Sequence, residues 1–305
     1  MVQAEIACLA GGKIILLSWP GTPQELHSAY AANAAARSGL PVPFVDVARG
    51  RRADELCYTL SVAGVSSVFT QVLGSGEERR LFSAEAEIRD LDLSFADEAL
   101  TCTVQSKDGS SAIGLLGDDG KGMRTVTEGE VIDREPRWAP GGRGEIVYAS
   151  AGIGRTKAGS RAGFGASSLH RLNLAQSTVE VLVADAKYDY FSPVPLSDTL
   201  IYAIRRPYRG SVRSPAGAIA RLLAAFRAKP ASATRALEAG VGDELVRITE
   251  SGIELVASGV LAFDASATGV IVYSSARALF RLASQSAAPG EQLAELSQVE
   301  QLVIC

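Results

Sequence analysis

A run of basic residues without an intervening acid is the strongest candidate for binding chemistry in this sequence. Eight Arg or Lys residues lie between Arg205 and Arg235, whereas the whole chain has a net charge of −4. Guanidinium groups bind carboxylates and phosphates through charge-assisted hydrogen bonds. This basic arm therefore points to an anionic partner, and its candidate binding residues are Arg205, Arg206, Arg209, Arg213, Arg221, Phe226 and Arg227.

The same segment predicts a helical insertion at about 214–239. Ser214-Pro215 is typical of a helix start, and apolar residues at i, i+3, i+4 and i+7 from Ile219 form one stripe. A basic amphipathic helix suits an acidic groove on a protein partner or an anionic membrane surface. The alternative is that the stripe packs on its own domain and the arginines are solvated. No nucleic acid is expected, because few aromatic side chains interleave with the basic residues.

A second basic stretch lies in the glycine-rich segment 151–168. Arg155, Lys157 and Arg161 occur there without an acidic residue. Backbone N–H groups of such a segment can cradle an anion, which makes these three residues weaker binding candidates. The segment does not match the phosphate-binding pattern GxxxxGK[ST], so a flexible loop is the other interpretation.

Repeats along the chain indicate which elements must position these residues. Each repeat has a short apolar start, a turn rich in Gly, Pro, Asp or Ser, and a strand pattern ending near Cys102, Tyr148, Tyr202 or Tyr273. Further strands follow each one, and three of these place Arg171, Arg247 or Arg281 at the same point. The four-strand unit recurs about every 40 residues, as in a propeller blade.

One repeat resembles a known family. The stretch PRWAPGGRGEIVYAS, Pro136 to Ser150, is similar to the SPDG-x-I-Y-S core of the TolB-like, WD-repeat-related β-propeller family, with Pro-Gly-Gly in place of the usual Pro-Asp-Gly. The resemblance covers roughly residues 85–298. It implies a β-propeller fold and no particular reaction.

The sequence therefore predicts an all-β protein: one propeller domain, residues 1–305, with six blades of four-stranded antiparallel sheet. Five blades is the alternative. Helical insertions are expected at about 22–39, where Thr22 and Pro23 suit a helix start and His27 would lie on the helix, and at about 214–239. The expected blades are about 43–83, 88–127, 131–183, 187–257 and 258–298, with a closing blade from 299–305 plus 4–20.

The central channel of such a ring is the place to look for a small-ligand site. Carboxylates near the blade starts, among them Asp90, Glu135 and Asp189, either face the channel or hold turn amides by hydrogen bonds. Asp189, Tyr190 and Trp138 are the channel candidates, although Trp138 also suits packing between blades. With two His residues, four Cys residues without metal spacing and no GxSxG motif, we expect no metal, no cofactor and no assigned catalytic residue.

These observations predict a non-enzymatic binding scaffold that engages a protein partner or an anionic surface. The alternative is a propeller hydrolase, or a protein that binds a small ligand or cation through channel carboxylates. The N-terminus lacks a basic signal-peptide start, and no apolar run is long enough for a transmembrane segment. A cytoplasmic location is therefore expected, or a periplasmic one if a leader is missing from the sequence.

Overall fold

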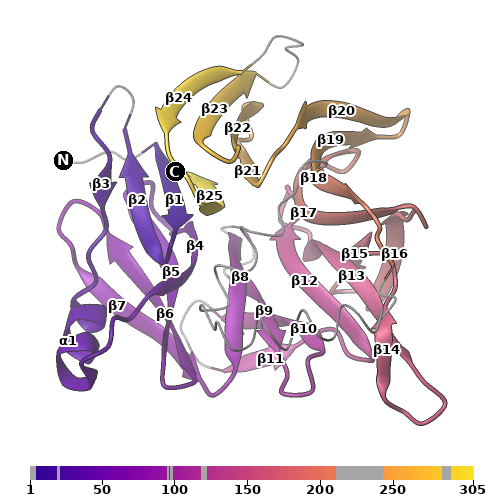
Figure 1. Cartoon of the computed structure of the whole chain (residues 1–305), viewed down its shortest axis with the longest axis horizontal. Coiled ribbons are helices and arrows are strands. Elements are labelled where there is room, and N and C mark those ends of the chain that lie inside the picture. The colour runs from indigo at the N-terminus through magenta and orange to yellow at the C-terminus, as the bar shows by residue number, and fades with distance from the viewer. Residues whose placement is uncertain are drawn as a thin grey trace, which may run out of the picture.

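Antiparallel β-sheets make up almost all of the secondary structure in the computed structural model (Figure 1). The structure describes residues 5–18, 21–94, 96, 99–117, 122–210, 243–283 and 290–305. Three sheets are four-stranded meanders of consecutive strands. They consist of β4 (Phe44–Arg49), β5 (Glu55–Val62), β6 (Val65–Val72) and β7 (Glu78–Ala84); of β17 (Tyr188–Ser197), β18 (Leu200–Pro207), β19 (Glu244–Thr249) and β20 (Gly252–Ser258); and of β21 (Ala262–Ala265), β22 (Val270–Ser274), β23 (Ala278–Ala283) and β24 (Glu291–Glu295).

A nine-stranded sheet joins two further meanders. The first contains β8 (Glu87–Ser94), β9 (Ala99–Gln105), β10 (Ser111–Gly117) and β11 (Met123–Thr125), and the second contains β12 (Val131–Trp138), β13 (Glu145–Arg155), β15 (Ser168–Asn173) and β16 (Thr178–Val183), with β14 (Arg161–Phe164) beside β13. One parallel pair, Ser111 with Ile132, joins β10 to β12. If the two meanders are counted separately the ring has six blades, and otherwise five, so the number of blades stays a prediction.

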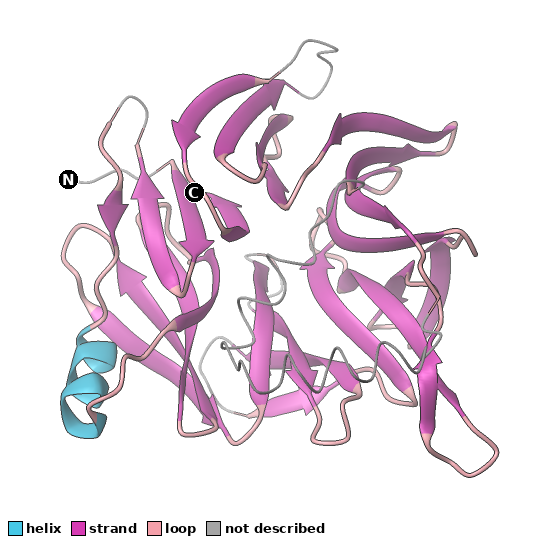
Figure 2. Ribbon diagram, viewed as in Figure 1, coloured by secondary structure: helices cyan, strands magenta, loops and turns pink. Residues whose placement is uncertain are grey.

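The last sheet combines strands from both ends of the chain. The C-terminal strand β25 (Val299–Ile304) pairs with β1 (Ile6–Ala10), which is followed by β2 (Lys13–Leu17) and β3 (Gln24–Glu25). Figure 2 shows the sheets arranged around a common centre, with β25 close to it. The innermost strands β25, β4, β8, β12, β17 and β21 contact one another in sequence and close the ring. These features confirm the predicted all-β propeller fold.

The second strand of each of four meanders is buried on both faces. In β5, β9, β13 and β18 four or more consecutive residues are buried, because neighbouring sheets cover both sides of each one. The largest core cluster includes Tyr202 of β18 with Leu169 of β15 and Ile271 of β22, so it spans neighbouring sheets. Burial of this kind favours continuous apolar runs over strict alternation, and hydrophobic contact between sheets holds the ring together.

The first helical insertion is shorter than predicted. Helix α1 spans Ala29–Ser38, with the Ser28 hydroxyl accepting a hydrogen bond from the Ala31 N–H and Gly39 ending it at a φ of 69°. The expectation that Thr22 and Pro23 begin the helix is wrong, because the chain first pairs with β2 as β3, and His27 precedes the helix. No described helix is long and apolar enough to cross a membrane. The second insertion, about 214–239, lies outside the described residues.

The predicted alignment of the repeats is wrong at a tyrosine, not at an arginine. Arg171 lies opposite Val147, and Arg247 lies opposite Tyr202. Val147 and Tyr202 each pair with the first residue after the register shift of the innermost strand, so the two arginines occupy matching positions. Because successive strand residues point to opposite faces, Tyr148 and Tyr202 lie on opposite faces of their sheets.

Replacement of Leu302 tests whether the C-terminal strand belongs to the cooperative core. Leu302 is 1% exposed in β25, so Leu302→Ala should lower the free energy of unfolding by about 2–5 kcal/mol, as expected for a buried leucine. Urea denaturation measures this effect. Val181→Ala on β16, where the side chain is 56% exposed, is the control with little expected loss. Equal stability of both variants would show that β25 does not contribute to the core.

Candidate binding site at the central cavity

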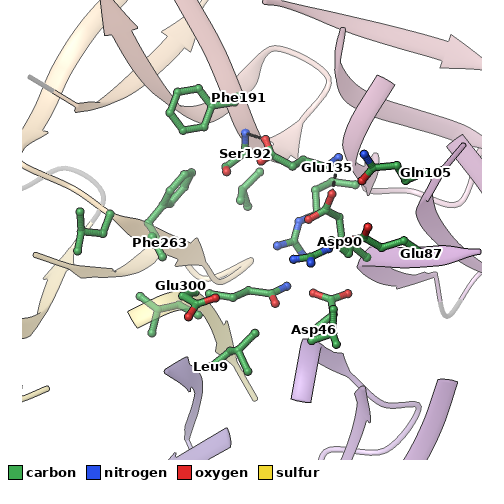
Figure 3. A pocket seen from close by; sticks show the side chains of 18 of the residues that line it. Leu9, Asp46, Glu87, Asp90, Gln105, Glu135, Phe191, Ser192, Phe263 and Glu300 are labelled. Carbon is green, nitrogen blue, oxygen red and sulfur yellow. Dashed lines mark hydrogen bonds and ion pairs between the residues drawn. The ribbon is translucent and has the colours of Figure 1, made fainter. Parts of the chain in front are cut away.

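A cavity of about 260 Å³ lies where the innermost strands of the sheets meet (Figure 3). One side is charged, with side chains from β4, β8 and β12, and the opposite side is largely apolar, with side chains from β1, β17 and β21. Figure 3 shows Phe263 across the space from Asp90, with Leu9 beside Asp46 at the lower edge of the view. The charged side contains Asp46, Glu87, Arg89, Asp90, Glu135 and Arg137.

Three neighbouring inner strands contribute to the cavity through the same irregularity. Asp90, Glu135 and Ser192 have positive φ angles of 55°, 56° and 50°. In each strand the pairing register shifts at this point, which is the mark of a β-bulge. Non-glycine residues rarely adopt this conformation, and it persists where surrounding contacts hold it.

Carboxylates of one inner strand hold the backbone of the next. Asp46 of β4 accepts the N–H of Leu91 in β8, and Asp90 of β8 accepts the N–H of Glu135 in β12 at 3.3 Å. Glu135 in turn accepts the N–H of Ser192 in β17. Each acceptor lies on one innermost strand and each donor on the next, so these contacts connect consecutive meanders around the cavity.

Further contacts of the same kind complete much of the ring. Asp264 of β21 accepts the N–H of Ile304 in β25 at 2.8 Å, and the Gln301 side chain of β25 accepts the N–H of Val47 at 3.1 Å. Asp92 accepts the N–H of Trp138 at 2.8 Å and pairs with Arg137 at 3.3 Å. Backbone N–H groups at the centre of the ring thus find hydrogen-bond acceptors in the side chains of neighbouring strands.

Burial shapes the electrostatics of this site. Burial, reinforced by the charge of Asp90, raises the pKa of Asp46 from 3.8 to about 7, although the Leu91 amide and Gln301 oppose the shift. Burial also raises the pKa of Asp92, against the effect of Arg137. Asp46 therefore gains a proton far more readily than an exposed aspartate.

Arg206 joins the cavity to the basic arm. It lines the cavity, its guanidinium lies over the Phe191 ring at 4.8 Å, and it forms two hydrogen bonds to Asp243 at 2.6 and 2.7 Å. The neighbouring Arg205 pairs with Glu244 at 2.6 Å. Arg205 and Arg206 belong to β18, whereas Asp243 and Glu244 stand at the start of β19. These two ion pairs therefore join the two ends of the insertion and partly neutralise the arm at its base.

The insertions leave the ring on the same face. The 156–160 turn joins β13 to β14, and the 208–242 segment joins β18 to β19. The ends of β13 and β18 lie beside the starts of the innermost strands β12 and β17. The segment containing α1 leads into the start of β4 on that face as well. Tyr208 links two insertions, because its hydroxyl donates a hydrogen bond to the Phe164 carbonyl of the β13–β14 hairpin. Glu87 and Glu300 stand at or next to the starts of β8 and β25 and line the cavity, so the cavity lies toward the same strand ends.

The channel candidates expected from the sequence do not line this cavity. Asp189 accepts the N–H of Ser167 at 2.8 Å, and Tyr190 is buried beside Arg205. Trp138 is buried between β8 and β12, with its indole N–H donating to the Asp92 carbonyl at 3.2 Å. Sequence reasoning did name Asp90 and Glu135, which face the cavity and hold backbone amides. It missed Asp46, for which the polar position within PFVDVA was the available signal.

The weaker basic candidates lie on a hairpin, so the expected flexible loop is wrong. β13 continues to Arg155 and pairs with β14, with Gly154 opposite Gly163. Arg155 pairs with Glu130 at 2.7 Å, and Arg161 donates to the Asp108 carbonyl. Lys157 is exposed in the turn.

Of the basic arm, the structure places Arg205, Arg206 and Arg209, and Arg209 is exposed. Arg213, Arg221, Phe226 and Arg227 lie outside the described residues. In the described part of the chain, no group of three or more His, Cys, Asp or Glu side chains is placed to hold a metal ion.

Comparison with solved structures agrees with this geometry. TolB from Acinetobacter baumannii matches with a TM-score of 0.62 and 13% identity over 98% of this chain and 66% of the TolB chain. A chain of a nidogen/laminin complex matches with a TM-score of 0.61 and 10% identity over 98% and 97% of the two chains. Oligogalacturonate lyase from Vibrio parahaemolyticus matches with a TM-score of 0.53 and 8% identity over 95% and 79%. No family model and no curated protein sequence matched the chain.

The fold is therefore that of TolB-like β-propellers. The matched proteins include a lyase and a chain of the nidogen/laminin complex, and at these identities the likeness extends to the fold alone. This chain spans slightly less than two thirds of the A. baumannii TolB chain.

The raised pKa of Asp46 predicts a pH dependence of stability. The folded protein binds the Asp46 proton more tightly than the unfolded chain does, so the contribution of Asp46 to stability is complete below about pH 4 and is lost as the pH rises through about 7. Asp46→Asn should reduce this loss by on the order of a few kcal/mol, measured by urea unfolding across that range. Asp54→Asn is the control, because the Arg52 contact lowers the pKa of Asp54 and it titrates below this window. Parallel profiles for wild type and Asp46→Asn would refute the assignment.

Proposed function

We propose that this protein is a non-enzymatic binding scaffold whose partner is a protein, held on the face of the ring where the central cavity opens. The observation that carries the proposal is the common position of the cavity and the insertions at the starts of the innermost strands. Binding residues are often found on loops that a rigid scaffold positions. A partner at this face contacts the cavity and the insertions together.

The size of the cavity favours a projecting group of a larger partner. Small-molecule pockets usually enclose about 300–1,000 Å³, and this cavity has about 260 Å³. One side chain or a chain end fits that space, with its apolar part against Phe191 and Phe263. The remaining contact area is then supplied by the surrounding face.

A hydrolase that uses the channel carboxylates, the alternative from the sequence, is less favoured. Asp46, Asp90 and Glu135 each accept a backbone N–H from the neighbouring strand, so they already serve to join sheets. A general acid or base must exchange its proton with a substrate, and movement of these groups would disturb the ring.

The charge of the basic arm favours an acidic protein as the partner, and an anionic membrane surface is the second candidate. Arg205 and Arg206 are paired with acids, so within the described residues Arg209 is the exposed cation at the base of the arm. Arg155, Lys157 and Arg161 are proposed to contribute weaker contacts from the hairpin on the same face. The cytoplasmic location stays a prediction from the N-terminal sequence.

Site-specific photo-crosslinking tests the proposed face. A photoreactive amino acid at Gln105, an exposed residue that lines the cavity, should crosslink to a discrete protein in the native cells, because a partner covers this face. The same amino acid at Val181, on the outer strand β16, should give no such product. Mass spectrometry identifies the product, and a chain lacking 212–237 shows whether the basic arm is required. Identical products from both positions, or none from Gln105, would contradict the proposal.

A further inference from the structure

A second cavity, of about 570 Å³, opens at the side of the ring. It lies between the outer part of the β8–β11 meander and the face of the sheet formed by β12, β13, β15 and β16. Because β11 has three residues and β16 has six, the neighbouring meander leaves part of that face uncovered. The apolar part of the lining consists of Val126, Val131, Leu172, Leu174 and Val179.

A buried carboxylate without a cationic partner lies in this cavity. Asp133 of β12 is 3% exposed, and its Oδ1 accepts the hydroxyl of Ser150 at 2.6 Å. Thr127 provides a second hydroxyl contact. Both partners are neutral, and among the described residues no ion pair involves Asp133. A buried carboxylate is normally paired with a positive charge, since burial disfavours an isolated one.

The other titratable groups around the cavity do not supply that charge. His170 of β15 is half-buried, and burial lowers its pKa, so the imidazole is neutral near pH 7. Its Nε2 lies 2.8 Å from the Ser168 hydroxyl. Arg124 of β11 and Glu128 of the link between β11 and β12 are exposed at the rim and have opposite charges.

A second polar side chain, Tyr148 of β13, lies in the same cavity. Tyr148 faces the ring of His170, the residue opposite it, with centroids 5.5 Å apart. Tyr148 is 4% exposed and lines the cavity, and its hydroxyl has no hydrogen-bond partner within the described residues. The cavity thus combines the carboxylate of Asp133, which has no cationic partner among the described residues, with the hydroxyl of Tyr148.

We propose that this side cavity binds a primary alkylammonium group, which pairs with Asp133 and donates a hydrogen bond to the Tyr148 hydroxyl oxygen. The ammonium supplies the charge that Asp133 lacks, and its three N–H groups suit several acceptors at once. The hydrocarbon part lies against Leu172, Leu174 and Val179. A free small amine and a lysine side chain of a partner share this chemistry.

Titration with butylamine, followed by ¹H NMR of the histidine ring protons, tests the proposal on the full chain. The sequence has two His residues, so His170→Gln identifies the His170 signals. Butylamine should shift the signals of His170 and leave those of the exposed His27 unchanged. Asp133→Asn should weaken binding at least about tenfold, as expected for loss of a charged hydrogen-bond partner, and Tyr148→Phe should weaken it several-fold. Glu128→Gln is the matched control at the rim and should bind as the wild type does.

The choice of probes separates the chemical features. 1-Butanol, without the charge, and butyltrimethylammonium, without N–H donors, should each bind at least about tenfold more weakly than butylamine. A short acetylated peptide with one lysine distinguishes a partner side chain from a free amine, because tighter binding than butylamine assigns the site to a partner. Far-UV circular dichroism checks that each variant is folded, and the probe series on the wild type tests the proposal even if Asp133→Asn does not fold. Equal binding of butanol and butylamine, an equal response of both histidines, or unchanged binding by folded Asp133→Asn would overturn it.

Discussion

The ring depends on side chains at its centre that accept backbone N–H groups from a neighbouring innermost strand. Asp46, Asp90 and Glu135 form three consecutive contacts of this kind, and Asp264 and Gln301 form similar ones near the chain ends. A hydrogen bond to a charged group contributes about 1.5–3 kcal/mol, and an unpaired buried carboxylate would cost at least as much. The β-bulges turn the amides toward these acceptors, so backbone strain at Asp90, Glu135 and Ser192 is offset by the contacts that it permits.

These contacts explain why the central and side cavities have different chemistry. In the central cavity the carboxylates are held by amides and lie near Arg89 and Arg137, so their positions are fixed by the ring itself. In the side cavity, Asp133 is held by hydroxyl groups and has no counter-charge among the described residues. The same residue type thus joins sheets in one place and remains available to a ligand in the other. The difference follows from neighbouring strands: inner strands meet at the centre, whereas short β11 leaves the outer face open.

The sequence was sufficient for the propeller fold because that fold repeats its strand and turn pattern. Tyr148, Tyr202 and Tyr273 follow similar turns, and the pattern located most strands within a few residues. It failed where the neighbouring strand decides the outcome. Tyr202 was aligned with Tyr148, from which it differs by one residue in register, and the glycines around Arg155 hid a hairpin that lacks hydrophobic alternation. The central cavity was only partly predictable, because Asp46 meets Leu91 through a contact between residues 45 positions apart, which no local spacing reveals.

The base of the basic arm shows how local charge counts mislead when strand pairing is unknown. Arg205 and Arg206 belong to an acid-free run in the sequence, yet β18 and β19 bring Glu244 and Asp243 beside them. Because Arg205 and Glu244 are register partners, the ion pair strengthens the same ladder that holds the two ends of the insertion together. Arg206 also contacts Phe191 at the cavity wall. Arg206 thus connects the base of the insertion to the wall of the central cavity through its contacts with Asp243 and Phe191.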